Sequence, residues 1–253
     1  MSDWLFDLGN SRFKATAWRA GGGIGEVLAW PHGIDNLADG GAAVDGMPRG
    51  RQAWLASVAS PALTAQVLAL LRGRFEQVHF ARTQAECAGV RVAYAQPQRL
   101  GVDRFLALLA AHALGGDVLV AGVGTALTID LLDAGGLHHG GRIAPSPTLM
   151  RQALHQRAAQ LPEMGGEYSE FADDTADALA SGCDGAAVAL VERSLQQAGR
   201  RLGRAPALLL HGGGAEALLP WLPQATFHPA LVLEGLAIWA RESQRGEAAA
   251  DLG

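Results

Sequence analysis

The pattern of apolar and polar positions alternates between short strands and helices. Residues 4–7 and 13–18 are apolar or alternating over strand length, and a Gly-Asn-Ser turn lies between them. Helical spacing predicts helices over residues 34–44 and 61–75, and an apolar run predicts a buried strand over 53–59 between them. The chain therefore begins as a β-hairpin followed by mixed strands and helices.

The second half of the chain repeats this order. Two apolar strands, at residues 118–122 and 126–133, again flank a glycine-containing turn. The other predicted elements are a strand at 78–80, helices over 105–114, 147–160 and 175–202, a glycine-rich loop at 140–147, a strand, glycine turn and helix over 207–219, and a closing helix over 231–243. We expect Gly182 and Gly185 to interrupt the helix over 175–202. The recurring order predicts a duplicated α/β fold with domains 1–115 and 116–253.

Composition narrows the class of protein. The 253 residues are 49% hydrophobic and 18% charged, enough for one large or two small cores. A net charge of −5 argues against a general nucleic-acid binder. Cys87 and Cys183 are too few for a disulfide framework and are expected to be buried thiols. Without a secretion-type start or an apolar run of ~18 residues, we expect a cytoplasmic protein without a membrane span.

The first hairpin carries candidate chemistry. Its first strand ends at Asp7, which could hold a hydrated divalent metal. Gly9 permits close approach of a ligand to the backbone, while Asn10, Ser11 and Lys14 supply donors and a positive charge. The alternative is an ordinary hairpin in which the acid and amide only form the turn.

The second hairpin strengthens the phosphate interpretation. Gly124 and Thr125 stand where glycine and asparagine stand in the first hairpin, and two such hairpins can clamp a polyphosphate. The P-loop pattern GxxxxGK[ST] is absent. The segment HGGGAEAL, residues 211–218, suggests a third approach of backbone to ligand, with a tight strand-to-helix turn as the alternative.

Together these motifs resemble the sugar kinase, Hsp70 and actin type of ATPase, and within it the type III pantothenate kinases, a family that includes the Bvg accessory factor proteins. The resemblance rests on ordered segments: DLGNSR at 7–12, YAQPQRLGVDR at 94–104, GVGTALTID at 122–130, GGRIAPSPTLMRQAL at 140–154, DTADALASG at 174–182 and HGGGA at 211–215. It implies two RNase H-like domains with ATP between them. It also implies a homodimer that uses ATP, Mg²⁺ and a monovalent cation (K⁺ or NH₄⁺) to phosphorylate pantothenate in the first step toward coenzyme A, with no nucleic-acid or membrane partner.

The resemblance also implies roles for individual residues. Asp103 would take the proton from the pantothenate hydroxyl; the alternative is that Asp103 and Arg104 cap the following helix. The ATP and phosphate ligands would be Asp7, Leu8, Gly9, Asn10, Ser11, Arg12, Phe13, Lys14, Gly124 and Thr125. Pantothenate would contact Tyr94, Gly101, Val102, Asp103 and Arg104, with Thr175 supplied by the partner subunit.

Each of these residues also has a plainer structural role open to it. Arg104 suits a carboxylate but could be a surface ion pair. Tyr94 could pack in the core, Thr175 could belong to a helix N-cap, and Thr128 could face the core of its strand. His138 and His139 are adjacent in a glycine-rich loop, so a shared metal role is disfavoured.

Two positions depart from the family pattern. The family has an aspartate, a ligand of the monovalent cation, where this chain has Gly122, and a glycine where it has Ser146. We therefore expect weaker cation binding, which an aspartate at position 122 would tighten if the backbone allows it. His211 is expected to be a turn residue. A kinase of another small hydroxyl substrate and a non-catalytic, nucleotide-binding regulatory protein remain alternatives.

Overall fold

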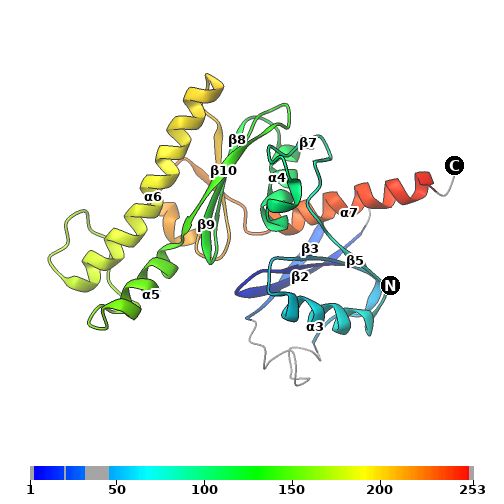
Figure 1. The fold of residues 1–253 in the computed structure, drawn as a ribbon, viewed down its shortest axis with the longest axis horizontal. Coiled ribbons are helices and arrows are strands. Elements are labelled where there is room, and N and C mark those ends of the chain that lie inside the picture. The colour runs from blue at the N-terminus through cyan, green and yellow to red at the C-terminus, as the bar shows by residue number, and fades with distance from the viewer. Residues whose placement is uncertain (1–2, 20, 32–45, 251–253) are drawn as a thin grey trace. The chain divides into compact units, whose positions relative to one another are not determined.

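The computed structural model describes residues 3–19, 21–31 and 46–250. The helix predicted over 34–44 lies outside these ranges. The chain forms two compact units: unit 1 comprises Met1–Leu114 and Ala230–Gly253, and unit 2 comprises Gly115–Pro229 (Figure 1).

Unit 1 is built on a five-stranded mixed sheet. Its strands are β1 (Asp3–Leu8), β2 (Arg12–Trp18), β3 (Ile24–Pro31), β4 (Gly50–Ser57) and β5 (Phe75–Phe80), in the order β3-β2-β1-β4-β5. The pairs β3–β2 and β2–β1 are antiparallel, whereas the pairs β1–β4 and β4–β5 are parallel. Side chains alternate between the faces, so Phe6 and Leu8 share one core cluster with Leu63 and Val67 of α3 (Pro61–Arg72). The first hairpin is confirmed, and β3 is a strand that the apolar pattern did not predict.

Two helices, α4 (Val102–Leu114) and α7 (Leu231–Ala250), pack against each other within unit 1. A Cβ on Gly235 of α7 would overlap the carbonyl of Leu106 in α4, so only glycine permits this close crossing. Trp239 of α7 contacts Trp54 of the sheet, with ring centroids 5.8 Å apart. The sequence-based division placed this last helix in the second domain. Its apolar face instead packs on the first unit, because α4 and Trp54 bury it there.

Short elements join β5 to α4. They are β6 (Glu86–Cys87), β7 (Val90–Arg91) and the 3₁₀ helix η1 (Pro97–Arg99). Both cysteines of the chain are buried free thiols, as predicted.

Unit 2 repeats the sheet of unit 1. Its strands are β8 (Val118–Val123), β9 (Ala126–Leu132), β10 (His138–Pro145), β11 (Ala207–His211) and β12 (Ala225–Phe227), in the order β10-β9-β8-β11-β12. The same pairs of strands are antiparallel and parallel as in unit 1. The predicted duplication is therefore present in the topology. Much of the segment predicted as a glycine-rich loop is instead the edge strand β10, which a bulge between His138 and Gly141 makes irregular.

The helices of unit 2 are α5 (Pro147–Arg157), α6 (Thr175–Leu202) and the short 3₁₀ helix η2 (Glu216–Trp221). Helix α6 is continuous over 28 residues, so the interruption predicted at Gly182 and Gly185 is wrong. Two glycines cost about 1 kcal/mol each in a helix, a small penalty beside the burial of this helix's apolar face on the sheet. Its ends carry normal caps: Asp174 accepts from two backbone N–H groups, and Gly203 at φ 72° ends the helix.

No helix in the described ranges is long and apolar enough to cross a membrane.

Candidate active site

The first hairpin presents polar groups at a tight turn. Asp7 at the end of β1 lies opposite Lys14 of β2 in the strand register. The Gly9 N–H donates to the Arg12 carbonyl at 3.1 Å, and Asn10 and Ser11 are exposed at the tip. The turn therefore offers polar side chains to a ligand.

Two residues predicted as phosphate ligands have their side chains in the core instead. Leu8 and Phe13 pair across β1 and β2, and both are fully buried in the cluster that packs on α3. Only their backbone groups remain for contact with a ligand, and the Leu8 carbonyl already accepts from the Val58 N–H at 3.1 Å. The side chains at these two positions are structural, and phosphate contact through their backbone stays a prediction.

Asp7 is electrostatically coupled to Asp103. Burial raises the pKa of Asp7 to about 6; Lys14 lowers it and the negative charge of Asp103 raises it further. Coulombic influence between carboxylates requires proximity, so the fold brings the end of β1 and the start of α4 together within unit 1. Perturbed acids of this kind cluster at functional sites.

Asp103 occupies the first turn of α4, where its carboxylate is held by the backbone. Its Oδ1 accepts from the Arg104 N–H at 2.8 Å. A Cβ on Gly101 would lie 2.6 Å from the same oxygen, so glycine leaves the space that the carboxylate needs. Helix α4 begins at Val102 rather than Phe105, and Asp103 makes the capping type of contact proposed as its alternative role.

Arg104 is buried, which excludes the expected alternative of a surface ion pair. The residue is 6% exposed. Its guanidinium donates to the Tyr94 hydroxyl at 3.3 Å and lies 6.0 Å from the centroid of that ring. Asp7, Asp103, Arg104 and Tyr94, together with Lys14, are thus the polar groups of one region of unit 1. A buried guanidinium presents planar donors that match a carboxylate.

The second hairpin is closed by its own backbone. The Gly124 N–H donates to the Ala126 carbonyl at 3.0 Å, and Gly124 and Thr125 are exposed. The Gly214 N–H donates to the Val123 carbonyl at 3.0 Å. At Gly212, with φ +94°, a Cβ would overlap the same carbonyl. The glycine turn after β11 therefore packs on the second hairpin, and the helix that follows it is the short η2.

Gly122 lies between His211 and Thr128 on neighbouring strands. The register pairs Gly122 with His211 on β11 and with Thr128 on β9. A Cβ at Gly122 would lie 2.7 Å from Nε2 of His211 and 2.9 Å from Oγ1 of Thr128. The backbone here would accept another residue, since its φ is not positive, but the space is filled. An aspartate at 122 would require the His211 imidazole to move, so the expectation that it would tighten cation binding stays a prediction that depends on this rearrangement.

The remaining predicted positions are placed as follows. Thr175 is the exposed first residue of α6, and the N-cap is Asp174. Ser146 caps α5 by accepting from the Leu149 N–H at 3.2 Å, which explains how a serine serves where the family has glycine.

The adjacent histidines bond to different acids. His138 lies 2.9 Å from Asp130, and His139 lies 2.8 Å from Asp133. Within the part of the chain that the structure describes, no group of three or more His, Cys, Asp or Glu residues could hold a metal ion. The position of His211 beside Gly122 was missed by sequence reasoning, because it depends on the register of two strands distant along the chain.

Comparison with known proteins identifies the family. A family model described as type III pantothenate kinase matches residues 4–197. This chain belongs to the type III pantothenate kinase family.

Relatives in the family cover nearly the whole chain. A type III pantothenate kinase from Stenotrophomonas maltophilia (strain R551-3) is 64% identical over 246 residues, which are 97% of this chain and 100% of the relative. One from Xanthomonas axonopodis pv. citri is 64% identical over 240 residues, which are 95% of this chain and 98% of the relative.

Solved structures confirm the fold. A protein from Campylobacter jejuni described as a Baf family transcriptional activator aligns over 96% of this chain and 99% of its own, with a TM-score of 0.65 and 19% identity. The activator of a 2-hydroxyisocaproyl-CoA dehydratase from Clostridium difficile aligns over 99% and 98%, with a TM-score of 0.52 and 10% identity. An archaeal actin homologue aligns over 95% and 99%, with a TM-score of 0.51 and 10% identity. This family member therefore has an actin-like fold.

Replacing Asp7 by Asn should stabilise the protein in a pH-dependent way. The folded-state pKa of about 6 lies above the ordinary 3.8, so stability is lost as pH rises through this window. The Asn variant lacks that loss. The free energy of unfolding of the variant relative to the parent should therefore increase between about pH 4 and 6 and level off near 1–3 kcal/mol. Urea unfolding at pH 4.5 and 7.5 measures this difference.

Asp133→Asn is the contrasting variant, because the pKa of this acid is shifted in the opposite direction. Desolvation opposes ionisation of Asp133, but the Leu137 N–H and His139 outweigh it and lower the pKa, so this variant should become relatively less stable only as pH rises toward 3.8 and should show no change between pH 4.5 and 7.5. A pH-independent difference for Asp7→Asn would contradict the coupling.

Gly122→Ala should destabilise unit 2 because its Cβ meets His211. Overpacking of this kind costs about 1–3 kcal/mol. His211→Ala removes the obstructing ring, so Gly122→Ala should cost much less in that background, and a double-mutant cycle by chemical denaturation gives the difference. Gly124→Ala is the matched control, since its Cβ would meet nothing closer than 3.9 Å. Equal costs of Gly122→Ala in both backgrounds would show that the imidazole is not the obstacle.

Proposed function

We propose that this protein transfers the γ-phosphoryl group of ATP to the hydroxyl of pantothenate, giving 4′-phosphopantothenate, the first step toward coenzyme A. The observation that carries the proposal is the cluster in unit 1, where Asp103 at the start of α4 influences the pKa of Asp7 and is followed by the buried Arg104. Membership of the kinase family gives this cluster its reaction class.

Asp103 is the group we assign to proton transfer. Phosphoryl transfer needs mainly positioning and neutralisation of charge, with a carboxylate that orients the attacking hydroxyl. The Arg104 N–H and the space at Gly101 fix the Asp103 carboxylate, which lowers the cost of orienting it during the reaction. Asp103 would accept the hydroxyl proton as the oxygen attacks the γ-phosphorus.

Arg104 and Tyr94 are suited to the carboxylate of pantothenate. The guanidinium is held by the Tyr94 hydroxyl and ring, so its fork is oriented before substrate arrives. Because the arginine is buried, an anionic partner would gain more there than at an exposed site. These two residues therefore provide selection for an acidic substrate.

Phosphate binding is assigned to the two hairpins. In unit 1, Asn10, Ser11 and Lys14 offer donors and a charge; in unit 2, Gly124 and Thr125 offer an exposed turn. Turn backbones with small residues suit phosphate oxygens because donors can approach closely.

The residues present fit a magnesium ion at Asp7. This carboxylate is destabilised by burial and by Asp103, so a nearby divalent cation would favour its ionised form. Mg²⁺ commonly uses one or two carboxylates plus phosphate oxygens. When bound it would neutralise charge on the phosphates.

The residues around Gly122 do not fit a monovalent cation. The position that would carry an acid has no side chain, and the neighbouring space holds the His211 imidazole and one hydroxyl. Hard cations prefer several oxygen ligands. We therefore propose that K⁺ or NH₄⁺ assists this enzyme only weakly, by general screening of phosphate charge. A K⁺ titration of activity at fixed ionic strength should show no saturation at low K⁺; saturation there would place a specific cation site elsewhere.

We further propose a homodimer working in the cytoplasm, where ATP is available. Large apolar side chains are exposed on unit 2: Phe171 at 97%, Met164 at 81% and Ile143 at 66%. Phe171 and Met164 precede Thr175 closely in sequence, so a partner that covers them would meet Thr175 as well. A self-complementary interface of this kind is isologous.

Asp103→Asn should lower turnover by about 10²-fold or more, the usual scale for a positioned general base. Pantothenate binding should change little, because Arg104 and Tyr94 remain. A coupled ADP-release assay measures turnover, and Glu234→Gln is the control, since it removes an acid from the first turn of another helix, α7. Turnover equal to the parent would mean that Asp103 serves only its helix.

Mixing two inactive variants tests the shared site. The Asp103→Asn substitution inactivates the site of the subunit that carries it, whereas Thr175→Arg obstructs the site of the partner subunit. In mixed dimers one site is intact, so activity should return to about a quarter of the parent by statistical exchange. Mixing Asp103→Asn with Asp7→Asn is the control and should restore nothing, because both residues belong to the same unit 1. No rescue in the first mixture, or a fully active monomer in light scattering, contradicts the dimer.

A further inference from the structure

A hollow of about 470 Å³ lies on unit 2, and Gly124 and Thr125 of the second hairpin are not among the residues that line it. Its floor is apolar and comes from β8 and β9, where Ile129 and Leu131 are buried. Its other side is the C-terminal part of α6, and its edge is the bulged part of β10, where Gly140 and Gly141 carry no side chain. The volume lies in the range of small-molecule sites.

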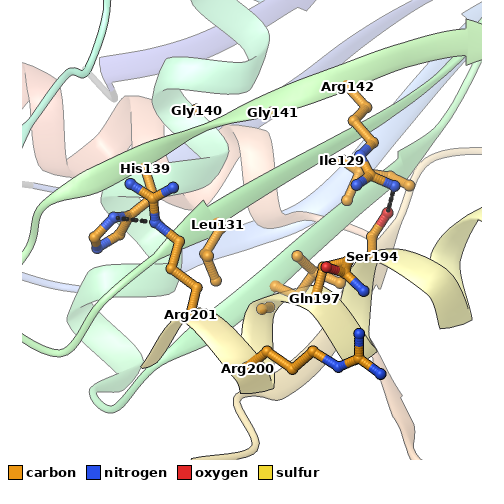
Figure 2. Close-up of a pocket in the computed structure, with 12 residues that line it drawn as sticks. Ile129, Leu131, His139, Gly140, Gly141, Arg142, Ser194, Gln197, Arg200 and Arg201 are labelled. Carbon is orange, nitrogen blue, oxygen red and sulfur yellow. Dashed lines mark hydrogen bonds between the residues drawn. The ribbon is translucent and has the colours of Figure 1, made fainter. Parts of the chain in front are cut away.

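Three arginines and no carboxylate line this hollow. Arg142 comes from β10, and Arg200 and Arg201 come from α6. Figure 2 shows Arg142 and Arg201 approaching from different elements, with Ile129, Leu131 and Gln197 between them. Among the described residues, none of the three arginines forms an ion pair. The hollow is therefore cationic above an apolar floor.

Two of these arginines are oriented by a hydroxyl and an imidazole. Arg142 donates to the Ser194 hydroxyl at 3.0 Å, and the Arg201 Nε donates to His139 at 3.0 Å. Each bond uses one donor and leaves the rest of the guanidinium fork for another acceptor. His139 is in turn held by Asp133 at 2.8 Å, which fixes the ring against which Arg201 rests.

Gln197 supplies a second, independent sign of a ligand. Its Nε2 is buried and has no hydrogen-bond partner among the described residues. A buried amide without a partner loses its hydrogen bond to water on folding, so an acceptor placed in the hollow would recover that loss.

Complementing the dipole of α6 is another role for the arginines at its C-terminus. That role accounts for Arg200 and Arg201 but not for Arg142, which lies on a strand, nor for the unpaired amide of Gln197. A purely electrostatic role would also leave the apolar floor of the hollow unexplained.

We propose that this hollow binds a small organic phosphate, a phosphate monoester with a compact apolar body. The phosphate would meet the guanidinium forks of Arg142 and Arg201, which match its oxygens in pairs. The apolar body would cover Ile129 and Leu131, and one oxygen would accept from Gln197. None of the residues assigned to the proposed reaction lines this hollow, and the proposal does not depend on that reaction.

Calorimetric titration of the full chain with phenyl phosphate tests the proposal. Inorganic phosphate, which lacks the apolar body, and phenol, which lacks the charge, are the companion probes. Saturable binding of phenyl phosphate should be tighter than that of either companion. Arg142→Gln and Arg201→Gln should each weaken it by about tenfold, the scale of one charge-assisted hydrogen bond.

Two controls assign the binding to this place. Arg193→Gln makes the same change of charge at an exposed position of α6 outside the hollow, and it should leave affinity unchanged. Thr125→Ala alters the second hairpin and should also leave it unchanged. Equal affinity in all variants, loss only in Thr125→Ala, or no saturation in the parent would each overturn the proposal.

Discussion

The conflict between burial and charge at Asp7 is the constraint on which the rest of unit 1 depends. A carboxylate at the end of a core strand is costly to ionise, and a second one at Asp103 makes it costlier. The β1–β2 register places Lys14 opposite Asp7 and so reduces the cost. Helix α4 presents Asp103 from its first turn, and α7 holds α4 through the close crossing at Gly235. The helix that closes the chain thus supports the acid that we assign to the reaction.

The two units use one topology for different chemistry. In unit 1 the first hairpin carries Asp7 and Lys14, and helix α4 adds Asp103 and the buried Arg104. In unit 2 strand β8 carries Gly122 near its end, and two glycines of the turn after β11, Gly212 and Gly214, pack on the Val123 carbonyl. Gly122 and His211 fit each other across β8 and β11, so the departure from the family pattern at 122 is matched by a ring that fills the space. An isolated change at either position would therefore disturb the other.

Much of this architecture was predictable from local patterns. Both hairpins, the buried strands and the helices α3 to α7 follow from apolar spacing and turn residues, and the order of motifs identified the family. Other features did not follow. Strand β10 holds four glycine or histidine residues at its start, and its pairing with β9 outweighs their weak strand preference. Helix α6 continues through two glycines because its burial on the sheet exceeds their local cost. The assignment of α7 to unit 1 and the placement of His211 depend on contacts between residues far apart in sequence, which no local pattern reports.

The most direct test of the proposed reaction is a coupled ADP-release assay of the parent protein with ATP and Mg²⁺, in which only the acceptor is changed. Pantothenate, panthenol and no acceptor form the matched set, because panthenol keeps the reacting hydroxyl but replaces the carboxylate by an alcohol. If Asp103 acts on the acceptor hydroxyl and Arg104 selects its carboxylate, ADP release should be rapid with pantothenate, much slower with panthenol and at background without an acceptor. Release at the same rate in all three would contradict the account, since it would show an ATPase to which pantothenate is irrelevant.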